Sequence, residues 1–326
     1  MTNGLISLCI ANYNKEKYIR ECLDSIKKHE NIKDLEIIFI DDCSTDNSLD
    51  IVRNRATENK EYNIIIKQNT INSWPWVTYN NAVQESHWEF ITFMDSDDFY
   101  IASTLYDKRD KLQNDKELQI LYWDGNIFEN NILFQQLIHY NGTRMFNSYS
   151  YDPQKILNDI LVKVPLLSLS TSLIRKDFFT KIGWFDPECF SNDRVLNIRI
   201  FKWLNTKNQF SIMNVPAFAY RIYSGNISKN YDKILMMLIQ VIEKYTPNDL
   251  KHIWFSNIYF THALWNLTTW NYKKAFSSMK KSYKFNKDYK KLVFFGISLL
   301  IPPRLLKVIP PDKLQKIKST ILWRFQ

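Results

Sequence analysis

The sequence predicts an α/β fold with a mostly parallel sheet, followed by a helical C-terminal region. Over the first 100 residues, short apolar segments alternate with amphipathic ones in a strand–helix order. Three of the apolar segments run directly into clusters of polar residues, and from residue 231 onward the apolar residues recur at helical spacing. A repeated strand–helix–strand order requires right-handed crossovers and places ligands at the carboxyl ends of the strands.

The individual elements follow from these patterns in order. Strands are predicted at residues 5–10, 35–40, 62–67 and 89–94, and helices at 15–30, 49–60, 77–86, 231–245, 248–270 and 271–285. The first helix places Ile19, Leu23 and Ile26 on one face, with polar residues between them. The second strand is apolar on both faces, as expected of a central strand in a parallel sheet.

The composition is that of a globular protein with an ample core. Of the 326 residues, 45% are hydrophobic and 24% are charged. The change of pattern predicts an N-terminal domain at 1–230 and a helical, basic region at 231–326. The four cysteines form no C-x-x-C pair, which favours reduced thiols in the cytoplasm. We expect no signal peptide, and no stretch reaches the ~18 apolar residues that a membrane span needs.

The net charge of +9 is concentrated at the C-terminal end. Residues 271–326 carry fourteen Lys or Arg against two acids, so the rest of the chain is slightly acidic. Within this tail, Leu314, Ile317 and Ile321 line one helical face, and lysines line the other. A basic amphipathic segment of this kind favours binding to an anionic membrane surface. The alternative is a helix that packs on the domain and exposes its lysines to water.

The polar clusters after the strands form the candidate functional site. They comprise residues 11–18, 41–46 and 95–98. In the last cluster, Asp95, Asp97 and Asp98 repel one another wherever the dielectric is low. The chain has six glycines and no common glycine-rich phosphate motif, so a ligand that carries phosphates would have to be held through a divalent cation. We expect Asp95 and Asp97 to hold this ion, Mn²⁺ or Mg²⁺. The alternative is that these acids cap helices.

Five segments of the chain resemble glycosyltransferase family 2, the nucleotide-sugar enzymes of the GT-A fold. They are ISLCIANYNKEKYIRECLDSI (6–26), LEIIFIDDCSTDNS (35–48), EFITFMDSDDFY (89–100), the stretch 170–201 and YRIYSGNIS (220–228). They occur in the family's order and cover roughly residues 4–230. The resemblance implies a GT-A fold and the transfer of a sugar from a nucleotide-sugar.

The resemblance also implies roles for residues on the donor side and at the metal. The donor-binding residues would be Ala11, Asn12, Tyr13, Asp42, Asn80, Asp95 and Ser96. Among them, Ala11 and Tyr13 would line the pocket for the base, and Asp42 would hydrogen-bond its edge. Asp97 would bind the metal ion, and Asp95 would face the ribose or the same ion.

The resemblance identifies Asp193 as the general base, which takes the proton of the acceptor hydroxyl. This residue precedes a predicted helix, so an N-cap role stays an alternative. The family pattern has Glu where Asn192 stands, and a histidine near the metal where Tyr223 stands, which leaves the third metal ligand open. Trp74 and Trp76 replace a common glycine and arginine, and they either stack on a sugar or pack in a loop.

These observations predict an inverting, metal-dependent glycosyltransferase. One metal-bound leaving group and one distant base fit a single displacement, whereas a glycosidase needs two carboxylates flanking one bond. The expected donor is a UDP-sugar, by family habit, and the expected acceptor is a saccharide or lipid-linked saccharide of a surface glycan. The enzyme would be cytoplasmic and peripheral on the inner face of the membrane. The alternatives are a nucleotidyltransferase, a non-catalytic scaffold and a nucleic-acid-binding protein, although the acidic cluster would repel a polyanion.

Overall fold

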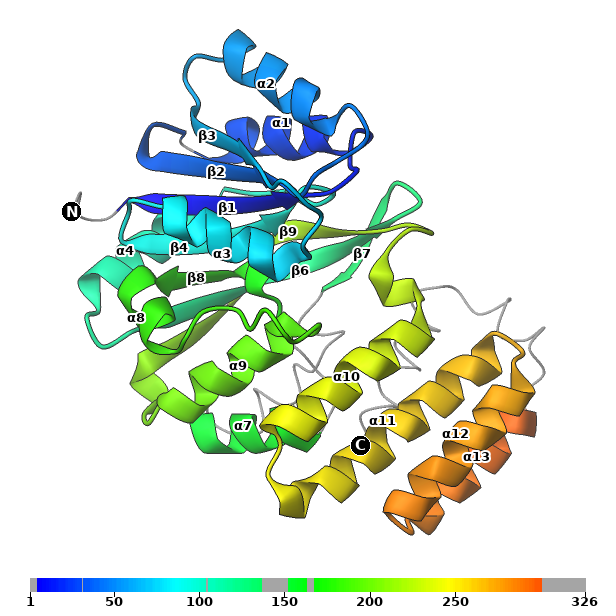
Figure 1. Ribbon diagram of the computed structural model, residues 1–326. Coiled ribbons are helices and arrows are strands. Elements are labelled where there is room, and N and C mark those ends of the chain that lie inside the picture. Colours follow the sequence, from blue (N-terminus) through cyan, green and yellow to red (C-terminus); the bar gives the residue numbers. More distant parts are fainter. Residues whose placement is uncertain (1–4, 31, 104, 137–151, 163–166, 301–326) are drawn as a thin grey trace. The chain divides into compact units, whose positions relative to one another are not determined.

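The computed structural model describes residues 5–30, 32–103, 105–136, 152–162 and 167–300 (Figure 1). The chain divides into two compact units. The first unit comprises residues 1–137, 167–188 and 203–222, and the second comprises 138–166, 189–202 and 223–326. These units are defined by contacts in space, and the domain boundary expected at residue 230 stays a prediction.

The first unit is built on a mixed sheet, which has nine strands in the described part of the chain. The strand order is β3-β2-β1-β4-β8-β6-β9-β5, and β7 pairs with β6. The strands are β1 (Ile6–Asn12), β2 (Leu35–Asp41), β3 (Asn63–Gln68), β4 (Phe90–Asp95), β5 (Phe99–Tyr100), β6 (Ile120–Glu129), β7 (Ile132–Gln136), β8 (Ser172–Arg175) and β9 (Phe210–Ile222). The four strands expected from the sequence correspond to β1 to β4, with bounds that shift by one or two residues.

The expected parallel arrangement is confirmed for β1 to β4, because β1 pairs in parallel with β2 and β4, and β2 with β3. Every residue of β1 and β2 is buried, which explains why both strands are apolar on two faces. In this register Asn12 lies opposite Asp41, and Ala11 lies opposite Asp95. The polar segments after these three strands therefore meet at one edge. Antiparallel pairs, among them β8 with β4 and β6, make the sheet as a whole mixed.

The helices described in the first unit are α1 (Ile19–His29), α2 (Ser48–Glu58), α3 (Pro75–Glu85), α4 (Leu105–Asn114) and α8 (Lys176–Lys181). Helix α3 packs across β1 and β2, and α1 lies beside α2 (Figure 1). Helix α1 also contacts β5. The apolar side of α1 is buried, as its spacing predicts. Helix α3 begins with Pro75, a residue suited to the first helical position because no N–H is needed there.

The second unit is mainly helical, as predicted for the residues after 230. It contains α7 (Pro153–Val162), most of α9 (Asn192–Trp203), α10 (Tyr231–Tyr245), α11 (Asn248–Thr268), α12 (Tyr272–Phe285) and α13 (Tyr289–Leu300). Helix α11 contacts α7, α10, α12 and α13. It is therefore the central element of this unit, and Trp254, Phe260 and His262 on it are buried.

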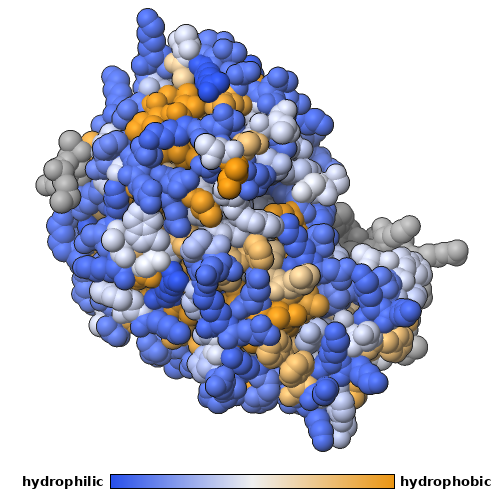
Figure 2. All heavy atoms as spheres, viewed as in Figure 1, coloured by the Kyte–Doolittle hydropathy of each residue, from blue (hydrophilic) through white to orange (hydrophobic). Residues whose placement is uncertain are grey.

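The described surface is mostly hydrophilic on the face that Figure 2 shows, where hydrophobic residues form small patches between polar ones. None of the described helices combines the length and the apolar character that a bilayer span requires. All four cysteines are free thiols, in agreement with the absence of a cysteine pair in the sequence.

Candidate active site

The carboxyl ends of β1, β2 and β4 meet in a hydrogen-bonded cluster around Asn12, which is 2% exposed. Its Nδ2 donates to Asp41 Oδ1 at 2.7 Å and to Ser44 Oγ at 3.1 Å. Its Oδ1 accepts a hydrogen bond from Ser96 Oγ at 2.7 Å, and its carbonyl accepts one from the Asp42 backbone N–H at 2.7 Å. One buried amide therefore fixes the segments after three strands relative to one another.

Asp95, Asp97 and Asp98 form an acidic cluster at this edge of the sheet. Each contributes a carboxylate oxygen, and these three oxygens lie within 4.8 Å of one another. Asp97 and Asp98 are 7% and 2% exposed, and Asp95 is half-buried. Asp95 and Asp97 are the metal ligands predicted from the sequence, and the structure adds Asp98 as a third carboxylate beside them.

Burial and the neighbouring carboxylates raise the pKa values of two of these acids. Burial and the neighbouring Asp97 raise the pKa of Asp95 to about 6, although a hydrogen bond from the Tyr79 hydroxyl at 2.7 Å opposes this shift. Burial, together with the charges of Asp97 and Asp95, raises the pKa of Asp98 well above its usual value. The cluster therefore disfavours its own negative charge and is stabilised by nearby positive charge.

Two cationic side chains supply part of this positive charge. Lys15 Nζ lies 2.6 Å from Asp97 Oδ2. The backbone N–H of Arg221, on β9, donates to Asp98 Oδ1 at 2.8 Å, and its Nε donates to the Asp97 carbonyl at 2.7 Å. Its Nη2 donates to Glu21 Oε2 at 2.6 Å. Arg221 therefore ties β9 and α1 to the acidic turn.

Lys15 lies in the polar cluster at residues 11–18 and Arg221 in the family-like segment 220–228, but no role was predicted for either residue or for Tyr79. Arg221 gives some signal, because a charged residue within an apolar strand indicates a buried partner. The partner itself cannot be read from the sequence, since Asp97 lies 82 residues from Lys15 and 124 residues from Arg221.

The acidic cluster has the donor atoms that suit a divalent cation. Carboxylate oxygens are the ligands that Mg²⁺ and Mn²⁺ prefer. Asp98 Oδ2 is buried and has no hydrogen-bond donor among the described residues, so a bound cation would satisfy it. The Lys15 ammonium on Asp97 shows that the cluster already accommodates a positive charge. The residues present therefore fit a metal ion.

The Asp42 carboxylate, which is 3% exposed, holds the loop before α3. It accepts hydrogen bonds from Asn69 Nδ2 at 2.8 Å, from the Ser73 N–H at 3.0 and 3.1 Å, and from the Trp74 N–H at 3.0 Å. Trp74 has a φ of 96°, a strained conformation for a non-glycine residue. Asp42 thus stabilises a strained loop, and its contact with a base stays a prediction.

The two tryptophans of this loop have different environments. Their rings stack with centroids 5.3 Å apart. Trp76 is 6% exposed and its Nε1 donates to the Pro187 carbonyl at 3.2 Å, so Trp76 packs within the first unit. Trp74 is 36% exposed and presents part of its ring to solvent. Of the two, Trp74 is the one that retains the surface needed to stack on a sugar.

The remaining donor-side residues also differ in their surroundings. Tyr13 is 43% exposed, whereas Ala11 is 8% exposed. Asn80 uses both ends of its amide on the backbone of Phe185, donating to its carbonyl at 3.0 Å and accepting from its N–H at 3.1 Å. These bonds give Asn80 a structural role, and its part near the sugar stays a prediction.

Asp193 belongs to the second unit, where it is half-buried and is the second residue of α9. It therefore lies inside the first turn and does not occupy the N-cap position. Its carbonyl accepts a hydrogen bond from Asn197 Nδ2 at 2.7 Å. Its role as the general base stays a prediction.

A family model and individual relatives relate this site to known proteins. The model described as "Glycosyl transferase family 2" matches residues 7–183, which is more than half of the chain. The chain belongs to this family.

Two curated relatives and one solved structure extend the comparison. The chain is 44% identical over 100 residues to a poly(ribitol-phosphate) beta-glucosyltransferase of Bacillus spizizenii. This match covers 30% of the present chain and 15% of that protein. The chain is also 24% identical over 257 residues to the UDP-Glc:alpha-D-GlcNAc-diphosphoundecaprenol beta-1,3-glucosyltransferase WfgD of Escherichia coli. This second match covers 78% of the present chain and 92% of WfgD. The first relative is thus far longer than the matched segment.

The fold is similar to the crystal structure of Staphylococcus aureus TarS 1–349 in complex with UDP-GlcNAc. The TM-score is 0.54 at 18% identity, and the match covers 98% of this chain and 89% of that chain. This likeness confirms the predicted GT-A fold.

Replacing Asp42 tests whether its carboxylate stabilises the loop before α3. Asp42→Ala should lower the free energy of unfolding by about 2–4 kcal/mol, because three donors in partly buried hydrogen bonds lose their charged acceptor. The near-UV circular dichroism of the Trp74–Trp76 stack should weaken as well. Glu61→Ala, which removes an exposed carboxylate, is the control and should leave both signals unchanged. An unaltered melting curve for Asp42→Ala would contradict the structural role.

Proposed function

We propose that this protein is an inverting, metal-dependent glycosyltransferase that transfers a sugar from a UDP-sugar to a saccharide or lipid-linked saccharide acceptor of a surface glycan. The observation that carries this proposal is the acidic cluster at the carboxyl edge of parallel strands in a family 2 chain. The relatives support the donor, because WfgD is named for UDP-Glc and the TarS structure contains UDP-GlcNAc.

The acceptor is proposed to carry phosphate as well as sugar. The names of both curated relatives contain a phosphate-bearing acceptor, poly(ribitol-phosphate) in one and alpha-D-GlcNAc-diphosphoundecaprenol in the other. These relatives differ in how much of their length this chain matches, yet they share this chemical feature. We extend it to the acceptor of the present protein.

Asp95, Asp97 and Asp98 would hold Mn²⁺ or Mg²⁺ on the leaving-group side. When bound, the ion neutralises charge on the departing nucleoside diphosphate, so no protein acid is needed there. Lys15 contacts the Asp97 carboxylate and the Arg221 N–H donates to Asp98, so both residues hold the acidic turn in place.

The donor's nucleoside is assigned to the segments that Asn12 holds together. Ala11, Tyr13 and Asp42 would bind the base, and the partly exposed Tyr13 ring offers a surface for stacking. Asn12 and Ser96 would act by positioning these segments, since their side chains bond to each other at 2.7 Å.

Asp193 would take the proton from the acceptor hydroxyl. The hydroxyl oxygen then forms a bond to the sugar carbon while the bond from that carbon to the diphosphate oxygen breaks. Attack from the side opposite the leaving group inverts the configuration at that carbon. A single carboxylate is sufficient for this displacement.

Turnover should require Mn²⁺ or Mg²⁺, and Asp97→Asn should reduce it about a hundredfold or more, because several kcal/mol of charge stabilisation depends on the ion. The measurement is the release of nucleoside diphosphate across a set of nucleotide-sugars, with and without metal. Asp110→Asn, which alters an exposed acid on α4, should keep normal turnover. Full turnover in excess EDTA would rule out the metal assignment.

Asp193→Asn should lower transfer about 10²–10⁴-fold, the usual effect of losing a general base. Affinity for the donor should not change, because the nucleotide makes no proposed contact with this carboxylate. Asp177→Asn, in the first turn of α8, is the matched control and should transfer normally. If the Asp193 variant transfers sugar at the wild-type rate, Asp193 is not the base.

We also propose that the protein is cytoplasmic and binds the inner face of an anionic membrane. Helix α13 exposes Val293 and Ile297, at 63% and 52%, whereas Lys291 on the same helix is 2% exposed. The buried Lys291 Nζ donates to Asn257 Oδ1 at 2.5 Å. Helix α13 contacts α12, which exposes several lysines, and apolar side chains combined with basic ones suit a lipid interface. The amphipathic segment expected after residue 300 lies outside the described residues.

Introducing charge on the outward side of α13 tests the membrane proposal. The double variant Val293→Asp, Ile297→Asp should reduce cosedimentation with phosphatidylcholine–phosphatidylglycerol vesicles about tenfold, because both side chains lose apolar contact with lipid. Ile132→Asp replaces a residue that is 62% exposed on β7, and it should bind as the wild type does. If the wild-type protein does not cosediment with these vesicles at low salt, the membrane proposal is wrong.

A further inference from the structure

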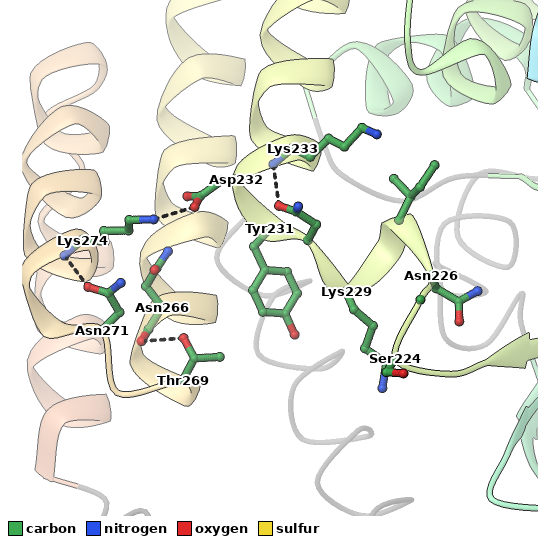
Figure 3. A pocket seen from close by; sticks show the side chains of 13 residues that line it. Ser224, Asn226, Lys229, Tyr231, Asp232, Lys233, Asn266, Thr269, Asn271 and Lys274 are labelled. Carbon is green, nitrogen blue, oxygen red and sulfur yellow. Dashed lines mark hydrogen bonds and ion pairs between the residues drawn. The ribbon is translucent and has the colours of Figure 1, made fainter. Parts of the chain in front are cut away.

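The second unit contains a polar pocket with a volume of about 550 Å³ (Figure 3). Two segments line it, residues 224–233 around the start of α10 and residues 266–274 around the turn between α11 and α12. Ile227 is the one aliphatic side chain among the lining residues. Pockets for uncharged organic ligands are mostly apolar, so this lining favours a polar or charged ligand.

The side chains that line the pocket carry a net positive charge. Three lysines, Lys229, Lys233 and Lys274, and one acid, Asp232, are among the lining residues. That acid is already paired, because Asp232 Oδ2 lies 2.5 Å from Lys274 Nζ and its Oδ1 lies 3.0 Å from His262 Nε2. The pocket therefore attracts anions.

Two helices begin at the pocket, and their dipoles add to this attraction. The caps of α10 and α12 are Asn230 and Asn271, whose side chains accept hydrogen bonds from the backbone N–H groups of Lys233 at 3.0 Å and Lys274 at 3.2 Å. Both caps line the pocket. Because the N-terminal end of a helix is positive, both ends favour a negatively charged ligand.

A buried hydrogen-bond network holds the pocket wall in shape. Asn266 lines the pocket and is 6% exposed, and its Nδ2 donates to the His262 carbonyl at 2.8 Å. The His262 ring, 3% exposed, contacts Ser278 Oγ at 2.8 Å through Nδ1 and Asp232 through Nε2. These contacts join α10, α11 and α12, so the pocket is formed before any ligand binds.

We propose that this pocket binds a phosphate group of the acceptor. A phosphate is compact, doubly or singly charged and rich in acceptor oxygens, which matches lysine ammonium groups and two helix N-termini. The inference rests on the proposed function, in which the acceptor carries phosphate. It assigns the phosphate to residues that the transfer chemistry does not use.

The test uses sn-glycerol 3-phosphate as the probe, titrated by calorimetry into the full chain in excess EDTA, so that no metal ion at the acidic cluster contributes. The double variant Lys229→Gln, Lys233→Gln should weaken binding about tenfold or more, because it removes two positive charges from the pocket lining. Lys273→Gln alters an exposed lysine of α12 outside the pocket lining and should bind as the wild type does. Glycerol without phosphate should not bind.

A separate titration with UDP and Mn²⁺ distinguishes the acceptor from the donor. The double variant should bind UDP as tightly as the wild type. If the double variant also loses affinity for UDP, the pocket binds the donor diphosphate and the proposal is overturned. If Lys273→Gln weakens binding of sn-glycerol 3-phosphate as much as the double variant does, the binding is due to diffuse surface charge and the proposal is wrong. Unchanged binding of sn-glycerol 3-phosphate in the double variant would also overturn the proposal. Since these titrations need no turnover, they decide the question even if the chain transfers no sugar.

Discussion

The buried amide of Asn12 is the contact on which the geometry of the candidate site depends. A parallel sheet brings the carboxyl ends of β1, β2 and β4 to one edge, but it does not orient the segments that follow them. The Asn12 side chain does so, because it donates to Asp41 and Ser44 and accepts from Ser96. An aspartate could not donate, and a smaller side chain could not span the strands. The positions of the acidic turn and of the Asp42 segment both follow from this amide.

The acidic cluster shows how the surrounding residues offset a repulsive arrangement. Three carboxylates within 4.8 Å destabilise the fold unless positive charge lies nearby. Lys15 and Arg221 supply such charge without covering Asp98 Oδ2, which stays buried and unsatisfied among the described residues. Stability and ligand binding thus make opposite demands on the same few atoms, a common property of functional sites.

The sequence predicted the strands and their polar ends because both are local patterns. Continuous apolar runs mark buried parallel strands, and Asp95 to Asp98 are adjacent in the chain. The contacts of Asp42 with Ser73 and Trp74 could not be predicted, because they depend on a loop conformation with positive φ. The partners of Arg221 depend on the register of a strand far along the chain. The pocket joins segments 224–233 and 266–274 through helix packing, which no local pattern encodes.

The contacts of Arg221 also bear on how the first unit is assembled during synthesis. Its guanidinium reaches Glu21 across 200 residues of chain, and its backbone N–H reaches Asp98 across 123. Contacts of such long sequence separation form late, because a large loop must close first. A nascent chain that has folded β1 to β4 therefore carries its acidic turn without the guanidinium until β9 has been made. During that interval, Lys15 is the cation from the N-terminal segment that can pair with Asp97.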